Sequence, residues 1–170
     1  AMYDAVDSLE RASDPGEFVM VALERGKTWL TEALNHGDLD ALVTMKGWAA
    51  TLRTATMQKQ LGKDAELAAT ELVRRAERCI GLGIRQGQEA GEITSRGHNN
   101  SDNTENIRNG CSLAKPTDFA SFHELNGSGG DSVGIYGLAD DVTDEQFDEA
   151  ITDAKTEGNL SRANVRRKIK

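Results

Sequence analysis

The stretch DAELAATELVRRAERCIGLGIRQGQEAGEI (residues 64–93) decides the fold class, because its apolar residues recur at the spacing of one helical face. Asp64 is typical of a helix start, and no proline lies between Pro15 and Pro116. Since proline is the residue that most reliably breaks a helix, the stretch predicts a long helix that begins at Asp64. Its apolar face consists of Ala69, Leu72, Val73, Ala76, Ile80, Gly83 and Ile84.

Two further helices are predicted upstream of this stretch. The run Asp14-Pro15-Gly16-Glu17 is typical of a helix start, because aspartate caps free backbone N–H groups and proline is tolerated at the first helical position. Gly37 ends this helix, and Asp38 caps a second one that ends near Leu61-Gly62. Short links make neighbouring helices antiparallel, so a long helical hairpin or small bundle is predicted over residues 3–92. The apolar stripes are Phe18, Val21, Ala22, Trp29, Leu30, Ala33 and Leu34 in the first helix, and Leu42, Met45, Ala49 and Leu52 in the second.

The remaining residues have a different composition. Residues 93–115 are rich in asparagine and poor in large apolar side chains, which predicts a mobile linker. Residues 116–170 are predicted to form a small helical unit with a Gly/Ser-rich loop, NGSGGDSVG. In this unit Thr143 opens one helix with a capping box, Gly158 ends it, and Ser161 caps the last helix. Two helices joined by a short glycine-containing turn give a helix-turn-helix-like pattern, and the whole chain is predicted to be all-α.

Charge is divided unevenly along the chain. The formal charge is −8, to which residues 1–158 contribute −13 and residues 159–170 contribute +5. Arginine donates paired hydrogen bonds to phosphate or to a guanine edge, and asparagine can pair with an adenine edge. The last helix is therefore predicted to bind double-stranded DNA through Arg162, Asn164, Arg166, Arg167, Lys168 and Lys170. Two alternatives stay open: these cations remain solvated near a helix C-terminus, or they pair with the acidic helix 143–157.

A second basic cluster lies on the long helix, at Arg74, Arg75 and Arg78. Glu71 precedes Arg75 by one turn, which predicts an ion pair within the helix. A solvated or partner-facing stripe is the favoured interpretation of this cluster. The two tryptophans are expected to anchor the core and would mark a partner interface if exposed. The candidate partner interface therefore consists of Trp29, Trp48, Arg74, Arg75 and Arg78.

Residues suited to catalysis are scattered. His36, His98 and His123 lack metal-ligand spacing, and adjacency in Ser121-Phe122-His123-Glu124 does not make a triad. Cys79 is expected to be a small core residue. We therefore expect no enzyme, no metal and no cofactor. No apolar run approaches the roughly 20 residues of a membrane span, so a cytoplasmic protein without a membrane partner is expected.

Two stretches carry a family resemblance. LVRRAERCIGLGIRQGQEAGEI (72–93) and DEQFDEAITDAKTEGNLSRANVRRKI (144–169) resemble small helical proteins of actinobacteria and of their phages and prophages. In that group a helix with an R-x-E-R-x-x-G-like core precedes a helix-turn-helix-like unit that ends in an S-R-x-x-V run. The C-terminal unit also resembles, more distantly, the DNA-reading part of ParB-type proteins. The resemblance implies a DNA-binding or regulatory role, although the Gly-rich residues 126–141 depart from the regular opening helices of the group.

These observations lead to two hypotheses. In the first, the chain is a phage or prophage regulator that binds double-stranded DNA through its last helix. Because the acidic body repels phosphate, this function requires a homodimer, formed through the 3-4-3 stripe of the second helix. In the second, the chain is an acidic helical phage protein that binds and modulates a host protein, with no nucleic-acid contact.

Overall fold

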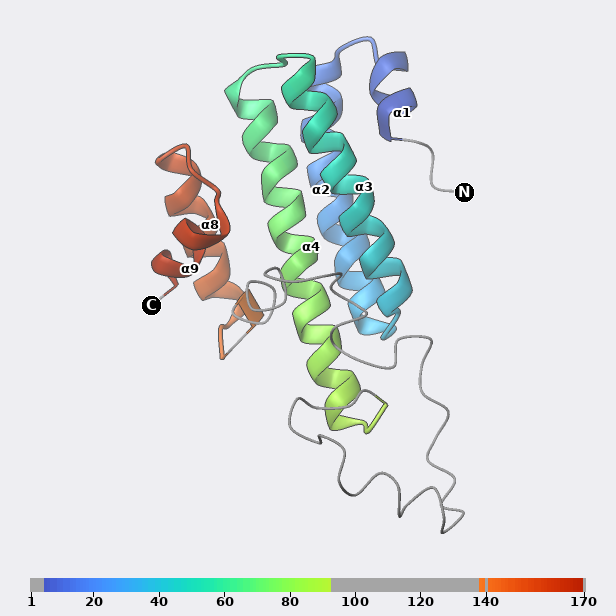
Figure 1. The fold of residues 1–170 in the computed structure, drawn as a ribbon, viewed down its shortest axis with the longest axis vertical. Coiled ribbons are helices and arrows are strands. Elements are labelled where there is room, and N and C mark those ends of the chain that lie inside the picture. Colours follow the sequence, from blue (N-terminus) through green and yellow to red (C-terminus); the bar gives the residue numbers. More distant parts are fainter. Residues whose placement is uncertain (1–4, 93–137, 140, 170) are drawn as a thin grey trace, which may run out of the picture.

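The computed structural model describes residues 5–92, 138–139 and 141–169. Its described residues form helices and no strand, so the prediction of an all-α fold is confirmed (Figure 1). The predicted linker 93–115 and the Gly/Ser-rich loop 126–134 lie outside the described residues. The helices are α1 (Ala5–Arg11), α2 (Pro15–Asn35), α3 (Leu39–Gln58), α4 (Lys63–Glu89), α8 (Asp144–Thr156) and α9 (Arg162–Lys168).

Local capping signals explain where α2 and α3 begin. The Asp14 carboxylate accepts a hydrogen bond from the Glu17 backbone N–H at 3.0 Å, and Asp38 accepts one from Ala41 at 2.9 Å. Between the two helices Gly37 has a φ of +66°, a conformation that costs glycine little. The start of α2, the cap of α3 and the turn between them are therefore as predicted.

One helix and two helix limits differ from the prediction. The short helix α1 was not predicted; it packs against α2 and α3 and buries Leu9. Helix α3 ends at Gln58, before the predicted Leu61-Gly62. Helix α4 begins at Lys63 with Gly62 as its N-cap, so Asp64 lies in the first turn and is not the cap.

Helices α2, α3 and α4 form a small antiparallel bundle, in which α4 packs against both of the others. Helix α4 approaches α2 at Gly26, where a Cβ atom would lie 2.4 Å from Leu72 Cδ1. It approaches α3 at Gly83, where a Cβ atom would lie 2.6 Å from Leu39 Cδ2. The core of the bundle is lined by buried residues that include Val19, Leu23, Leu30, Leu42, Leu52, Leu72, Ile80 and Ile84.

Two predictions about the apolar stripes are wrong. Val21 is 40% exposed, because Val19 and Leu23 occupy the core-facing positions of α2. The stripe of α3 is buried inside the bundle rather than free for a second copy of the chain, so it does not provide a dimer interface. Its members are Leu42, Met45, Ala49 and Leu52.

Helices α8 and α9 pack together on the side of α4 that faces away from the bundle, and we call them the α8–α9 unit (Figure 1). The predicted capping box of Thr143 is confirmed, since its hydroxyl accepts from the Gln146 N–H and the Gln146 side chain accepts from the Thr143 N–H. Gly158 ends α8 with a φ of +70°, and Ser161 caps α9. A second apolar cluster forms here from Leu138, Phe147, Ile151, Ala154, Leu160 and Val165, with Leu67 of α4.

None of the helices in the described ranges combines the length and the apolar character that crossing a bilayer requires.

Candidate functional site

The side of α4 that faces the α8–α9 unit is charged, although it is buried. Glu71, Arg74, Glu77 and Arg78 are each less than one-tenth exposed. They reach residues of the α8–α9 unit across the contact. We call this set the charged seam: Glu71, Arg74, Arg75, Glu77 and Arg78 of α4 with Asp144, Asp148, Lys155 and Arg162 of the α8–α9 unit.

Glu77 lies at the centre of the charged seam, and its side chain is 0% exposed. Its Oε2 accepts from Arg74 Nη1 at 2.8 Å, and its Oε1 accepts from Arg162 Nε at 2.9 Å and from Arg162 Nη2. Arg74 Nε in turn donates to the Leu160 carbonyl at 2.9 Å. A buried carboxylate is stable only when cations and donors surround it, so Glu77 needs Arg162 of α9 as well as its own helix.

Glu71 forms the second centre, three residues or just under one helical turn before Arg74. It accepts from Arg75 Nε at 2.8 Å and from Lys155 Nζ of α8 at 2.9 Å, and Lys27 Nζ of α2 lies 3.6 Å away. Burial by itself raises the pKa of Glu71, but the hydrogen bonds from Lys155 and Arg75 outweigh it and hold the pKa below its ordinary value. The carboxylate is therefore charged at neutral pH.

Arg75 and Arg78 reach the first turns of α8. Arg75 Nη1 donates to Asp148 at 2.7 Å, and Arg78 donates to Asp144 at 2.6 Å and to the Val142 carbonyl at 2.8 Å. Both guanidinium groups lie over the ring of Phe147, at 5.8 and 5.0 Å from its centroid. Arg78 Nε is buried and has no hydrogen-bond partner among the residues that the structure describes. The Phe147 ring thus packs the apolar part of the contact directly beneath the ion pairs.

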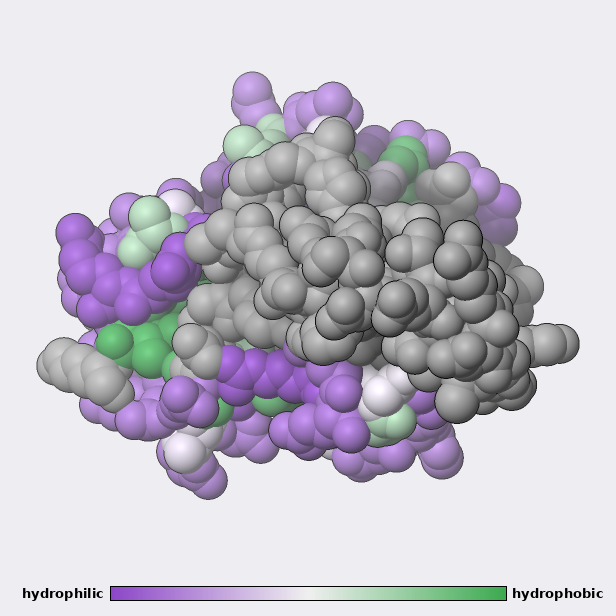
Figure 2. Space-filling view, turned by 60° about the horizontal axis from the view of Figure 1, so that its bottom comes forward, coloured by the Kyte–Doolittle hydropathy of each residue, from purple (hydrophilic) through white to green (hydrophobic). Residues whose placement is uncertain are grey.

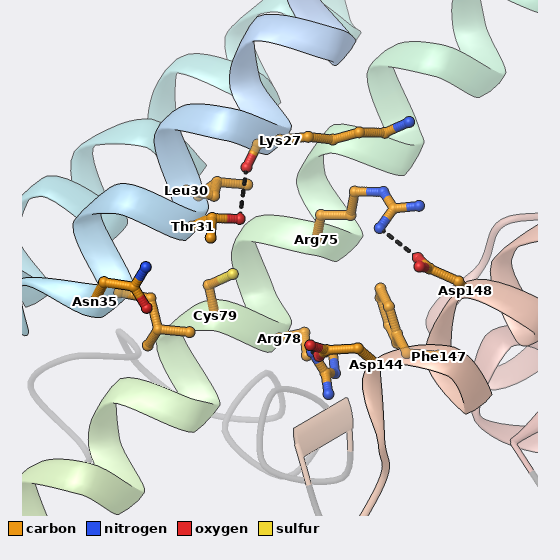
Figure 3. A pocket seen from close by; sticks show the side chains of 11 residues that line it. Lys27, Leu30, Thr31, Asn35, Arg75, Arg78, Cys79, Asp144, Phe147 and Asp148 are labelled. Atoms are coloured by element: carbon orange, nitrogen blue, oxygen red, sulfur yellow. Dashed lines mark hydrogen bonds and ion pairs between the residues drawn. The ribbon is translucent and has the colours of Figure 1, made fainter.

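A hollow of about 280 Å³ opens beside these groups, between α2, α4 and α8 (Figure 3). Leu30 and Thr31 of α2 form one wall, Asp144 and Phe147 of α8 form the other, and Cys79 lies between them on α4. Burial raises the pKa of the Cys79 thiol to about 11. The thiol is therefore protonated and unreactive at neutral pH, which agrees with the structural role expected for it.

The basic helix α9 uses part of its polar side chains within the molecule. Asn164 is 3% exposed and donates to Glu157 at 3.0 Å and to the Asn159 carbonyl at 2.8 Å, while its Oδ1 accepts from Arg167. Lys168 Nζ pairs with Glu157, and hydrogen bonds from Lys168 and Asn164 lower the pKa of Glu157. Asn164 was expected to contact DNA, but in the structure its side chain is buried and turned away from solvent.

The other predicted DNA-binding residues are placed differently. Arg162 is joined to Glu77, as described above. Arg166 and Arg167 are exposed, and Arg166 forms no ion pair with any residue in the described ranges. Lys170 lies outside the described residues. The structure thus brings Asn164 and Lys168 to Glu157, in line with the open alternative of pairing with the acidic helix 143–157, whereas Arg162 pairs with Glu77 of α4 instead.

The structure places all five residues of the candidate partner interface in contacts within the chain. Trp29 and Trp48 are partly buried and pack against the bundle core, as anchors do. Arg75 pairs with Glu71 as predicted. The basic cluster is predicted to be a solvated or partner-facing stripe; of these alternatives, the solvated one is wrong for Arg74 and Arg78, because the α8–α9 unit covers them.

The outer side of α8 carries carboxylates at a regular spacing. Glu145, Glu149 and Asp153 lie four residues apart, so they follow one line along the helix, and all three are exposed. None of them forms an ion pair with a residue that the structure describes. We call these three residues the acidic ridge. Figure 2 shows that hydrophilic residues dominate the described part of the face it draws.

Sequence reasoning missed the charged seam. Glu77 and Arg162 are 85 positions apart, and nothing in the sequence indicates that they pair with each other. A usable signal was the pattern R-x-E-R at 75–78 on a helix that has apolar residues on its other side, because a charged helix between two packed layers must pair its charges. Within the described ranges, no group of three His, Cys, Asp or Glu side chains could hold a metal ion.

The comparisons with known proteins returned nothing: the chain matches no protein family, no curated protein and no solved structure.

Proposed function

We propose that this chain is an acidic helical protein that binds a partner protein through α8. In this proposal α9 does not contact the partner but holds α8 in place through ion pairs within the same chain. One observation carries the proposal: the carboxylates of the acidic ridge have no cationic partner in the described part of the chain, although the adjoining helix α9 is strongly basic. The cations that could have neutralised the ridge serve Glu77 and Glu157 instead.

The spacing of the acidic ridge costs stability, which supports a role in binding. Like charges four residues apart on a helix destabilise it by about 0.2–0.5 kcal/mol for each pair. Asp153 adds to this cost, because a carboxylate in the last turn opposes the helix dipole. A partner that presents a basic surface would supply the missing countercharges, and the charge of −8 would speed its approach.

DNA binding through α9 is the second candidate, and it rests on Arg166 and Arg167. Both are exposed, so two guanidinium groups per chain remain for phosphate. Residues 1–158, with a charge of −13, repel the same phosphates. A single copy would therefore bind DNA weakly, with a shallow dependence on salt.

The test compares the acidic ridge with an equal loss of charge elsewhere. The variant Glu145→Gln/Glu149→Gln/Asp153→Asn removes the ridge, and the control Glu32→Gln/Asp40→Asn/Glu89→Gln removes three exposed carboxylates from α2, α3 and α4. Each protein is used to capture partners from a nuclease-treated lysate of the organism that encodes it. We expect the wild type and the control to retain the same protein partner, and the ridge variant to lose it.

DNA binding is measured in parallel by fluorescence anisotropy on a labelled duplex between 50 and 500 mM KCl. We expect no more than about two counterions to be released, given the two exposed arginines. A steep salt dependence with tight binding, together with a partner that disappears after nuclease treatment, would contradict the proposal and favour the DNA-binding candidate.

A further inference from the structure

The contact between α4 and the α8–α9 unit differs in chemistry from the contacts within each part. The bundle has its own apolar cluster, and the α8–α9 unit has a second one around Phe147 and Ile151. Leu67 is the one residue of α1 to α4 that belongs to the second cluster, among the described residues. Each cluster is therefore built mainly from one part, and the apolar contact between the parts is small: Leu67 joins the second cluster, and the Phe147 ring lies beneath Arg75 and Arg78.

The charged seam supplies most of the polar contacts between the two parts. Arg74, Arg75 and Arg78 extend from α4 to backbone and carboxylate oxygens of the α8–α9 unit, and Arg162 extends back to Glu77. Buried ion pairs contribute little net stability relative to hydrated ions, because desolvation offsets their attraction. Removing one partner of such a pair destabilises the contact strongly, since the other charge is left buried and unpaired. A contact of this kind is therefore specific, but its two sides can separate at little net cost because water hydrates both sets of charges.

We propose that the charged seam is a releasable latch: the α8–α9 unit leaves α4 as a folded body when Arg162 is withdrawn from Glu77, and its departure uncovers Cys79 and the arginines of α4. In the latched form α8 forms one wall of the hollow around Cys79. The latch thus withholds Arg74 and Arg78 from solvent, as an autoinhibitory contact does. The inference does not depend on the partner that the acidic ridge binds.

Two arginines of α9 provide a matched pair of variants. Arg162 pairs with Glu77, whereas Arg166 on the same helix is exposed and forms no ion pair with a described residue. Arg162→Ala and Arg166→Ala therefore remove the same side chain and charge from α9, and the first alone breaks the latch. Arg162→Lys keeps the charge but loses the paired donors, so it should fall between the two.

The first readout is alkylation of Cys79 by iodoacetamide in the full chain, with Cys111→Ser in every variant so that one thiol reacts. We expect Arg162→Ala to accelerate the reaction about tenfold, because local opening exposes the thiol and returns its pKa toward normal. Arg166→Ala should react like the wild type. Helix content by far-UV circular dichroism should be equal in all of them, because the unit leaves folded.

The second readout measures the separation directly. Spin labels at Thr31→Cys on α2 and Thr152→Cys on α8, both exposed positions, report the distance across the seam in a chain with Cys79→Ser and Cys111→Ser. We expect one narrow distance in the latched form and a longer, broader distribution with Arg162→Ala. Equal alkylation rates for the two alanine variants, an unchanged distance, or a loss of helix content with Arg162→Ala would each overturn the latch.

Discussion

Gly26 in α2 and Gly47 in α3 meet different surroundings, although both lie inside helices. A Cβ atom at Gly26 would press on Leu72, which is fully buried, whereas nothing lies within 4 Å of the Cβ position at Gly47. Glycine inside a helix costs roughly 0.5–1 kcal/mol relative to alanine. At Gly26 the absence of a side chain is what lets α2 approach α4, and at Gly47 it brings no packing gain.

The two glycines therefore predict changes of opposite sign. Gly47→Ala should raise the free energy of unfolding by about 0.5–1 kcal/mol, through helix propensity alone. Gly26→Ala should lower it by about 1 kcal/mol, because overpacking of roughly 1–3 kcal/mol exceeds the gain in propensity. Urea unfolding followed by circular dichroism measures both. A stabilised Gly26→Ala would show that Leu72 moves aside freely.

Cys79 allows a second prediction at this scale. A thiol with a pKa of about 11 is almost fully protonated at pH 8. In the wild-type fold, with Cys111→Ser, iodoacetamide should react with Cys79 about a hundredfold more slowly than in urea-unfolded chain, where the pKa returns to near 8.5. A reaction rate that begins to level off between pH 8 and pH 9, as that of an unperturbed thiol does, would contradict the raised pKa of this side chain.

At the scale of the element, the starts of α2, α3, α8 and α9 were predictable because their signals are local. Asp14, Asp38, Thr143 and Ser161 each cap the helix that their sequence neighbourhood indicates. A capping aspartate or hydroxyl acts on N–H groups two or three residues away, so a single sequence contains all the information. Helix α1 carries no comparable signal, and its position depends on packing against α2 and α3.

The cap of α8 leads to a prediction for that helix. Thr143→Ala removes the hydroxyl that accepts from the Gln146 N–H and should destabilise α8 by about 1 kcal/mol. Hydrogen exchange of the α8 amides should accelerate, with α3 unchanged as the internal reference. Thr143→Ser keeps the acceptor and should behave like the wild type. Equal exchange rates in the two variants would show that the Thr143 hydroxyl does not stabilise α8.

The faces of α4 show where sequence reasoning stops. Its apolar face follows from the spacing of Leu72, Ala76 and Ile80, and these residues are buried as predicted. Its charged face looks solvated in the sequence, because pairing partners such as Arg162 and Asp144 lie beyond a long intervening segment. Helical periodicity indicates which residues share a face but not which distant element covers it, so the candidate site had to come from the structure.

At the scale of the whole molecule, the charged seam ties stability to acid pH. Hydrogen bonds keep the pKa of Glu71 below its ordinary value of 4.5, against the opposing effect of burial. A carboxyl group whose pKa is lower in the folded chain stabilises the fold above its unfolded pKa, and this contribution disappears as the pH falls through the folded pKa. The structure should therefore lose stability below about pH 4.5.

The corresponding experiment is thermal unfolding of the wild type and of Glu71→Gln between pH 7 and pH 3. Glu71→Gln should be less stable at pH 7, because Arg75 and Lys155 lose their countercharge. The gap between the two proteins should narrow as the pH falls, since the wild-type carboxylate takes up a proton. A constant gap across this range would mean that Glu71 does not contribute to the acid dependence.

The charged face of α4 has a consequence for a chain that is cut. If a protease cleaved between Glu92 and Leu138, the fragment that ends after α4 would newly expose charged side chains rather than an apolar surface. Water hydrates guanidinium and carboxylate groups readily, so this fragment would stay in solution and would not aggregate. Helix α4 therefore contacts its bundle mainly through apolar side chains and the α8–α9 unit mainly through ion pairs, so the bundle fragment left by such a cut would carry a mostly charged new surface.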